Sequence, residues 1–264
     1  MIIICFVTGW LNPRKCAPLI VAANRDERYE RGGEPPSFAE GESYSYLAPR
    51  DPVAGGTWIG INSAGLLVAL TNGDETGEYE TSRGNIVAKL LGEGGSIGEG
   101  REMLEEIQLS EYEDFSLVLI DPREKLFFTA EENEGTFQMQ EEGSFFLSNL
   151  ANLEIFSAGE VMKFPWGSHS GEAKAERLRG RLQNFCRQHR PFREHGELCR
   201  HGDDFGTVSS TIIILDFGRD RLVYDFAAGA PCETTYYSVD IPEEFEESFF
   251  DSWRGGFSSS QLSC

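Results

Sequence analysis

The segment Leu19-Ile20-Val21-Ala22-Ala23-Asn24-Arg25-Asp26-Glu27 joins a short apolar run directly to four polar residues. The apolar part does not alternate with polar residues, which predicts a strand buried on both faces. The run from Ile2 to Thr8 has the same character, and Asn12-Pro13-Arg14 between the two runs is a turn signal. We therefore predict a β-hairpin whose second strand ends in Asn24 to Glu27, a place where polar groups commonly build a site.

The remaining chain predicts further hairpins and amphipathic helices. Residues 28–56 are polar and rich in Pro and Gly, which predicts a loop, and a second hairpin turns at Asn62-Ser63-Ala64-Gly65. Apolar residues at helical spacing predict helices over 83–91, 97–107 and 172–189. The last of these should cover a sheet with Leu178, Leu182 and Phe185. Further strands are expected over 115–120, 126–130, 136–139, 145–147, 211–215 and 222–226, and a mobile loop over 190–206.

This order of elements predicts one α+β domain over residues 1–240, in which helices pack on antiparallel sheets. A chain of 264 residues is long enough to bury a single large core. Residues 241–264 are acidic and then rich in Ser and Gly, which predicts a tail without fixed structure.

Composition excludes several classes of function. With 23 Lys and Arg against 44 Asp and Glu, the formal charge is −21, which argues against binding to nucleic acid or to an anionic membrane surface. The apolar start is too short for a signal peptide or a membrane span, and no other stretch approaches the length of a span. The 6 cysteines include no CxxC pair, so we expect reduced thiols in a cytoplasmic protein.

The four histidines show no ligand spacing with acids or cysteines, so the sequence predicts no metal centre and places them on the surface or in loops. They are His169, His189, His195 and His201.

Several blocks of sequence resemble the NRDE family, also called the Transport and Golgi organisation 2 family. The most specific are Ala22-Ala23-Asn24-Arg25-Asp26-Glu27 and Gly55-Gly56-Thr57-Trp58-Ile59-Gly60. Similar later blocks are Leu67-Val68-Ala69-Leu70-Thr71-Asn72, Ser82-Arg83-Gly84, Leu147-Ser148-Asn149 and Gly206-Thr207-Val208-Ser209-Ser210-Thr211. Together they span about residues 5–215.

The family pattern also resembles N-terminal-nucleophile hydrolases of the bile-salt hydrolase and penicillin V acylase type. That resemblance implies a four-layer αββα sandwich of two antiparallel sheets. It implies Cys5 as nucleophile, Asp26 facing the amine of that cysteine, and Asn72 and Asn149 as the amide groups near the reacting carbonyl. Further residues are expected to line the ligand pocket, namely Asn24, Arg25, Glu27 and Trp58.

Two departures weigh against a working hydrolase. Such enzymes use the free α-amino group of the cysteine as base, but Ile4 precedes Cys5 here. The arginine often found in the Gly-Thr-Arg-Ser-Ser block is Val208, so a cation is missing. A buried structural role for Cys5 is also open, because free cysteines are often buried.

Two functions follow from the resemblance. The first is a cytoplasmic protein that binds a small molecule or takes part in haem trafficking, with no required cofactor and haem as a transported ligand. The alternative is a cysteine hydrolase that cleaves an amide bond once Cys5 is exposed as the first residue. The mature N-terminus would discriminate between them.

Overall fold

The computed structural model describes residues 5–11, 17–73, 81–141, 143–149, 152–156, 175–192 and 196–257. Within these ranges the strands form two seven-stranded sheets, and the paired strands in both are antiparallel. The first sheet has the order β11 (Asn152–Phe156), β10 (Gly143–Ser148), β1 (Phe6–Leu11), β2 (Leu19–Arg28), β12 (Phe205–Asp216), β13 (Arg221–Ala227) and β14 (Tyr237–Ser238). The second has the order β3 (Glu34–Glu40), β4 (Ser45–Arg50), β5 (Ile59–Asn62), β6 (Leu67–Asn72), β7 (Phe115–Ile120), β8 (Lys125–Glu131) and β9 (Glu134–Gln140).

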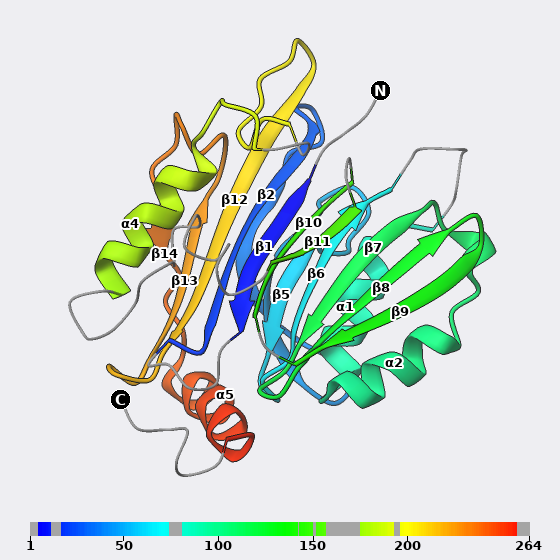
Figure 1. Ribbon diagram of the computed structural model, residues 1–264, viewed down its shortest axis with the longest axis vertical. Coiled ribbons are helices and arrows are strands. Elements are labelled where there is room, and N and C mark those ends of the chain that lie inside the picture. Colours follow the sequence, from blue (N-terminus) through cyan, green and yellow to red (C-terminus); the bar gives the residue numbers. More distant parts are fainter. Residues whose placement is uncertain are drawn as a thin grey trace.

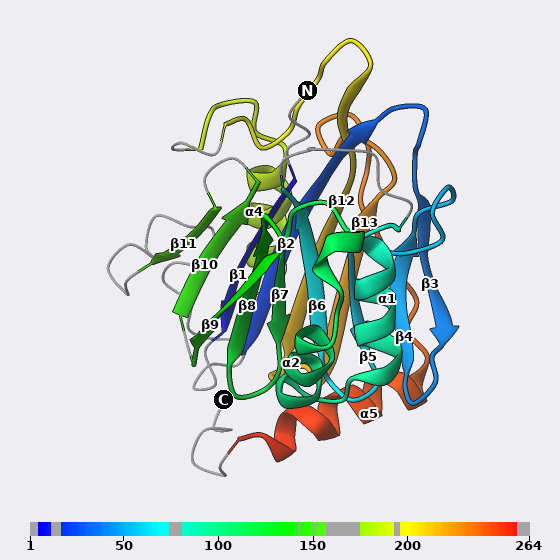
Figure 2. The ribbon, with the colours of Figure 1, turned by 90° about the vertical axis from the view of Figure 1, so that its right-hand side faces the viewer.

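Helices cover the outer faces of both sheets (Figures 1 and 2). Helix α4 (Ala175–Cys186) lies on the first sheet, and α1 (Gly84–Glu93) and α2 (Ile97–Glu105) lie on the second. The short 3-10 turn η1 (Leu109–Glu111) follows α2, and α5 (Glu243–Gly255) crosses one end of the two sheets. The predicted four-layer αββα sandwich is therefore confirmed. Among the described residues, no helix is both long and apolar enough to cross a membrane.

Three apolar layers hold the sandwich together, and β2 shows how the sequence divides between them. Val21 faces the layer between the sheets, whereas Ile20 faces α4, because successive strand residues point to opposite faces. Leu178, Leu182 and Phe185 of α4 are buried against this outer face, as the helical spacing predicted. Each such leucine contributes about 1.5–3 kcal/mol relative to an exposed one.

Residues 28–56 do not form the predicted loop, because they contain the hairpin of β3 and β4. The prolines Pro35 and Pro36 suggested loop structure. They lie where the register between β3 and β4 shifts, between Glu34 and Ser37, on the edge strand of the sheet. An edge strand and an irregular register both tolerate residues that lack a backbone N–H donor.

Two other segments also differ from expectation. Residues 243–255 form α5, and its aromatic side chains Phe249 and Trp253 are fully buried in the layer between the sheets. The described part of 190–206 has defined backbone pairing, with bridges from Pro191 to Glu197 and from His201 to Gly206. Composition suggested mobility in both segments, but their apolar and backbone contacts fix them. Residues 258–264 lie outside the described ranges.

Candidate functional site

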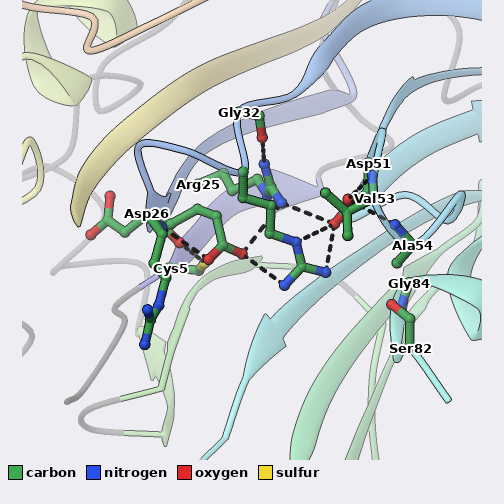
Figure 3. A network of polar contacts seen from close by, with 12 residues as sticks. Cys5, Arg25, Asp26, Gly32, Asp51, Val53, Ala54, Ser82 and Gly84 are labelled. Carbon is green, nitrogen blue, oxygen red and sulfur yellow. Dashed lines mark hydrogen bonds and ion pairs between the residues drawn. The ribbon is translucent and has the colours of Figure 1, made fainter. Parts of the chain in front are cut away.

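Cys5 lies immediately before β1, between the ends of the two neighbouring strands. Phe6, the next residue, pairs with Asn24 on β2 and with Ser148 on β10. Cys5 is therefore one position beyond these pairs, beside Arg25 on one side and Asn149 on the other. Its side chain is 7% exposed, and the thiol is 3.5 Å from the backbone oxygen of Asp26, which accepts its hydrogen bond (Figure 3).

The thiol of Cys5 has a pKa raised to about 12. Burial is the main cause because it disfavours the thiolate, and the negative charge of Asp26 acts in the same direction. The positive charge of Arg25 opposes this shift without cancelling it. In this environment Cys5 is a protonated thiol at neutral pH and a weak nucleophile.

Arg25 is the centre of a buried ionic network (Figure 3). Its guanidinium lies 4.2 Å from the centroid of the Trp58 ring, a cation–π geometry. It forms ion pairs with Asp51 at 3.1 Å and Glu27 at 3.4 Å, and it donates a hydrogen bond to the backbone oxygen of Gly32. A charge at this depth requires such partners, because the side chain is only 6% exposed.

Arg31 and Asp51 complete this network from outside the strand. Arg31 lies 2.8 Å from Asp51 and 3.4 Å from Glu27, so two guanidiniums face two carboxylates. Burial acts to raise the pKa of Asp51. Hydrogen bonds from the backbone of Ala54 and from Arg31 outweigh it, so this pKa is lowered. Neither residue was predicted to belong to a site, because both lie in the segment expected to be loop.

A pocket opens beside Cys5, between the ends of the two sheets. It is lined by Cys5, Arg25, Trp58 and Asn72. Arg31 and Arg83, which lies just before α1, add two further guanidiniums. It has a volume of about 460 Å³, including the part open to solvent. The structure thus brings Cys5 and Asn72 to one cavity from different sheets.

The glycines of the second sequence block position this wall of the pocket. Gly55 has φ +77°, a conformation that favours glycine. A Cβ atom on Gly56 would collide with the backbone of Gly84, and Thr57 donates a backbone hydrogen bond to Gly84 at 3.1 Å. This close approach places the start of α1 against the strand that follows Trp58.

Asp26 lies on the opposite face of β2 from Arg25 and Glu27, because strand side chains alternate. Its carboxylate accepts a hydrogen bond of 2.6 Å from the hydroxyl of Thr207 on β12. Burial raises the pKa of Asp26 to about 7, and the bond from Thr207 and the charge of Arg200 lower it only in part. Asp26 therefore approaches Cys5 through its backbone oxygen, and its carboxyl group titrates near neutral pH.

Asn24 does not face the pocket, although the sequence analysis expected it to bind a ligand. Its side-chain amide donates to the backbone oxygens of Cys186 at 2.9 Å and Leu198 at 2.6 Å. It is 2% exposed and shares the α4 face of β2 with Asp26. Asn24 holds the end of α4 and the segment after it against the sheet, which is a structural role.

Of the other predicted residues, Arg25, Glu27 and Trp58 line the pocket, and their contact with a ligand stays a prediction. Asn149 directly follows β10 beside Cys5. The catalytic roles assigned to Cys5 and the two asparagines stay predictions. Val208 lies at an irregularity of β12, where the register against β2 shifts between Thr207 and Ser209.

The structure also brings together four possible metal ligands, three from residues 189–201 and the fourth from residue 232. His189 and His201 approach Cys199 and Cys232, with all four ligand atoms within 4.8 Å of one another. The absence of a metal centre stays a prediction, although four residues able to bind a metal lie together here; the fold brings Cys232 to the other three. His169 and His195 lie outside the described residues.

Comparison with known proteins supports the sequence blocks. A model of the family described as Transport and Golgi organisation 2 matches residues 1–201. The Transport and Golgi organization protein 2 homolog of Bos taurus is 36% identical over 95 residues, which are 33% of this chain and 34% of that protein. The Mus musculus homolog is 40% identical over 74 residues, 26% of this chain and 27% of that protein. The matched stretches thus span about a third or less of these curated relatives.

A solved acylase structure shares the fold. Penicillin V acylase from Agrobacterium tumefaciens has a TM-score of 0.52 at 12% identity, over 90% of this chain and 87% of that chain. A variant of the conjugated bile acid hydrolase from Clostridium perfringens has a TM-score of 0.49 at 11% identity, over 89% of this chain and 97% of that chain. At 12% identity the likeness to the acylase describes the sandwich and not its chemistry.

Proposed function

The chain belongs to the Transport and Golgi organisation 2 family, and from this premise we propose that it is a cytoplasmic protein that binds a small anionic molecule in the pocket beside Cys5. Haem is the first ligand to test, because the family resemblance implies a role in haem trafficking. The observation that carries the proposal is the protonated, buried thiol of Cys5 beside a pocket whose charged groups are already arranged.

The charges of the pocket suit a ligand with a carboxylate. Three guanidiniums line it, from Arg25, Arg31 and Arg83, against the carboxylates of Glu27 and Asp51. Each guanidinium already has an acidic partner, since Arg83 pairs with Glu113 at 3.1 Å, so a ligand carboxylate would share these guanidiniums with the carboxylates of the protein. Apolar contact would come from the pocket's aromatic and aliphatic side chains. A ligand that combines an acidic group with an apolar body fits both features.

Absorbance titration of the full chain with haemin tests this proposal. We expect saturable binding, and Arg31→Gln should weaken it about fivefold, as for the loss of one partly exposed ion pair. Arg31 is suitable because its side chain is 35% exposed, so its replacement should leave the fold intact. The matched control is Arg101→Gln on α2, which removes the same charge from an exposed pair with Glu105. Non-saturable binding, or equal affinities in both variants, would contradict the proposal.

A second function, cleavage of an amide bond, is favoured by the position of Cys5 and Asn72 in one pocket. In that mechanism the thiolate attacks the carbonyl carbon, and the amide donors stabilise the resulting oxyanion. The amine leaves with a proton, and water then hydrolyses the thioester. The base would be the α-amino group of Cys5, with a pKa of about 7.7–8 when free. Here that nitrogen is in a peptide bond with Ile4, so it cannot act as a base.

An acylase assay with penicillin V separates the two functions. The full chain should show no turnover. A variant lacking residues 2–4 would expose Cys5 after removal of Met1. Turnover by that variant, abolished by Cys5→Ser, would establish a latent hydrolase. Turnover by the uncleaved full chain, abolished by the same substitution, would overturn the binding proposal.

A further inference from the structure

The cluster of His189, Cys199, His201 and Cys232 is separate from the pocket beside Cys5. We propose that it is a structural zinc site. It combines two thiols and two imidazoles, the ligand set that zinc prefers in closed four-coordinate sites. The residues lie just beyond α4, in the segment before β12 and in the turn after β13.

The separations between the ligand atoms suit a tetrahedral ion. Two sulfurs bound to one zinc lie about 3.8 Å apart, and a sulfur and a nitrogen lie about 3.6 Å apart, given bonds of about 2.3 and 2.0 Å. In the structure, the Sγ atoms of Cys199 and Cys232 are 3.4 Å apart. Nε2 of His201 lies 3.9 Å from the first sulfur and 3.1 Å from the second. For these three atoms, shifts of about 0.3–0.5 Å would give the tetrahedral separations, and the fourth ligand atom, from His189, lies within 4.8 Å of them.

Backbone contacts hold the fourth ligand and the three segments in place. Nδ1 of His189 is 3.0 Å from the backbone oxygen of Cys199, and the two histidine rings lie 5.2 Å apart. Donation from Nδ1–H to that carbonyl leaves Nε2 with a lone pair, an arrangement common in zinc-bound histidines. The backbone N–H of Cys199 also donates to Gln188 at 2.9 Å, and Arg187 donates to the backbone oxygen of Pro231 at 2.8 Å. These bonds preform the site.

A disulfide between Cys199 and Cys232 would explain the cluster less completely than a zinc ion. The sulfur separation of 3.4 Å exceeds a disulfide bond of about 2.05 Å, and a disulfide gives no role to the two converging histidines. Four protein ligands also leave no open position, which makes the site structural and not catalytic. On binding, each thiol would lose its proton to solvent as the metal–sulfur bond forms.

The site would stabilise the region behind Asp26. Cys199 lies between Leu198, whose backbone oxygen binds Asn24, and Arg200, whose backbone N–H donates to Thr207 at 2.9 Å. Thr207 in turn donates to the carboxylate of Asp26. A metal here would therefore fix the segment that supports the buried polar face of β2.

The test is the metal content of the full chain, purified with reduced thiols, without a histidine tag and without chelator. Elemental analysis should give about one zinc per chain. Replacement by Co²⁺ should give the charge-transfer and visible bands of a tetrahedral cobalt–thiolate centre. His201→Ala should weaken zinc binding at least about tenfold, and it should still fold because His201 is exposed. The double variant Cys199→Ser with Cys232→Ser should lose the metal.

Cys5→Ser is the matched control, since it removes a thiol outside the cluster and should keep the full zinc content. Three results would overturn the proposal. One is a reduced wild-type chain that binds neither zinc nor cobalt. Another is unchanged zinc in both the His201→Ala and the double cysteine variants. The third is an intact mass and peptide map that show Cys199 and Cys232 joined as a disulfide in the zinc-supplemented protein.

Discussion

The residues of one sequence block, Asn24 to Glu27, alternate between the two faces of β2 and have different contacts on each face. On the face between the sheets, Arg25 and Glu27 join a network of opposite charges beside an open pocket. On the α4 face, Asn24 and Asp26 bond to backbone oxygens and to a hydroxyl, and both are 2% exposed. Alternation along one strand thus separates groups suited to a ligand from groups that hold the sandwich together.

This contrast shows that four adjacent polar residues need not form one site. Their place at the end of a buried strand is consistent with a functional site, yet only every second residue reaches the pocket. The Cys5 thiol lies beside Arg25 and approaches Asp26 through a backbone atom. Substitutions on one face of β2 at a time therefore test whether the pocket residues and the structural residues are separated in this way.

The largest expected effect is on the reactivity of Cys5. A pKa of about 12 against an ordinary 9.0 lowers the thiolate fraction at neutral pH about 1000-fold. Alkylation of Cys5 by iodoacetamide should therefore be much slower than that of N-acetylcysteine, and the 7% exposure of the side chain slows it further. Peptide mapping by mass spectrometry over time measures the rate. A rate equal to that of the free thiol would contradict the raised pKa, and a faster rate would show an activated thiol and favour the hydrolase.

Arg25→Met should destabilise the fold by about 3–5 kcal/mol, because it leaves Glu27 and Asp51 buried with one guanidinium fewer. Urea unfolding measured by circular dichroism gives the difference. Arg101→Met is the control for an exposed pair and should cost less than about 1 kcal/mol. Equal effects of the two substitutions would contradict a buried ionic network on the pocket face.

Asp26 should make stability fall as pH rises. Its pKa is about 7 in the folded chain against an ordinary 3.8, so between these values the folded chain keeps a proton that the unfolded chain has lost. From about pH 5 to about pH 8, the wild type should lose about 2–3 kcal/mol relative to Asp26→Asn. Urea midpoints at intervals across this range measure the difference. Parallel pH profiles would show that Asp26 has an ordinary pKa.

The smallest expected effect is that of Asn24→Ala, which should cost about 1–3 kcal/mol because two buried carbonyl oxygens lose their donor. Ligand affinity in the haemin titration should not change, since Asn24 is absent from the pocket lining. Unfolding and titration of the same preparation check both statements. A loss of affinity without a loss of stability would place Asn24 in the ligand site.

Strong local patterns predicted many of the strands and helices, and the resemblance to N-terminal-nucleophile hydrolases implied the four-layer sandwich. The apolar runs of β1 and β2 and the helical spacing of Leu178, Leu182 and Phe185 required no tertiary information. The predictions were wrong where composition was given more weight than the periodicity of apolar residues. Phe245, Phe249 and Trp253 recur every four residues, which is helical spacing, but the surrounding acidic residues suggested a tail. In the hairpin of β3 and β4, prolines on an edge strand suggested a loop.

The candidate site was predictable only where sequence blocks carried it. Arg25 and Asn72 belong to such blocks, and Cys5 was implied by the resemblance to N-terminal-nucleophile hydrolases; the structure places all three around one pocket. Arg31 and Asp51 have no pattern that distinguishes them from other surface charges. Cys199 and Cys232 are separated by a complete hairpin, so no linear spacing could indicate that their sulfurs lie 3.4 Å apart.

Helix α5 affects the order in which the parts of the protein fold during synthesis. The indole nitrogen of Trp253 donates to the backbone oxygen of Gly65 at 2.9 Å, across 188 positions of sequence. Because the aromatic face of α5 completes the layer between the sheets, this layer stays incomplete until the ribosome has passed Trp253. The chain therefore acquires its native core after most of its synthesis, and its earlier hairpins expose apolar surface to chaperones until then.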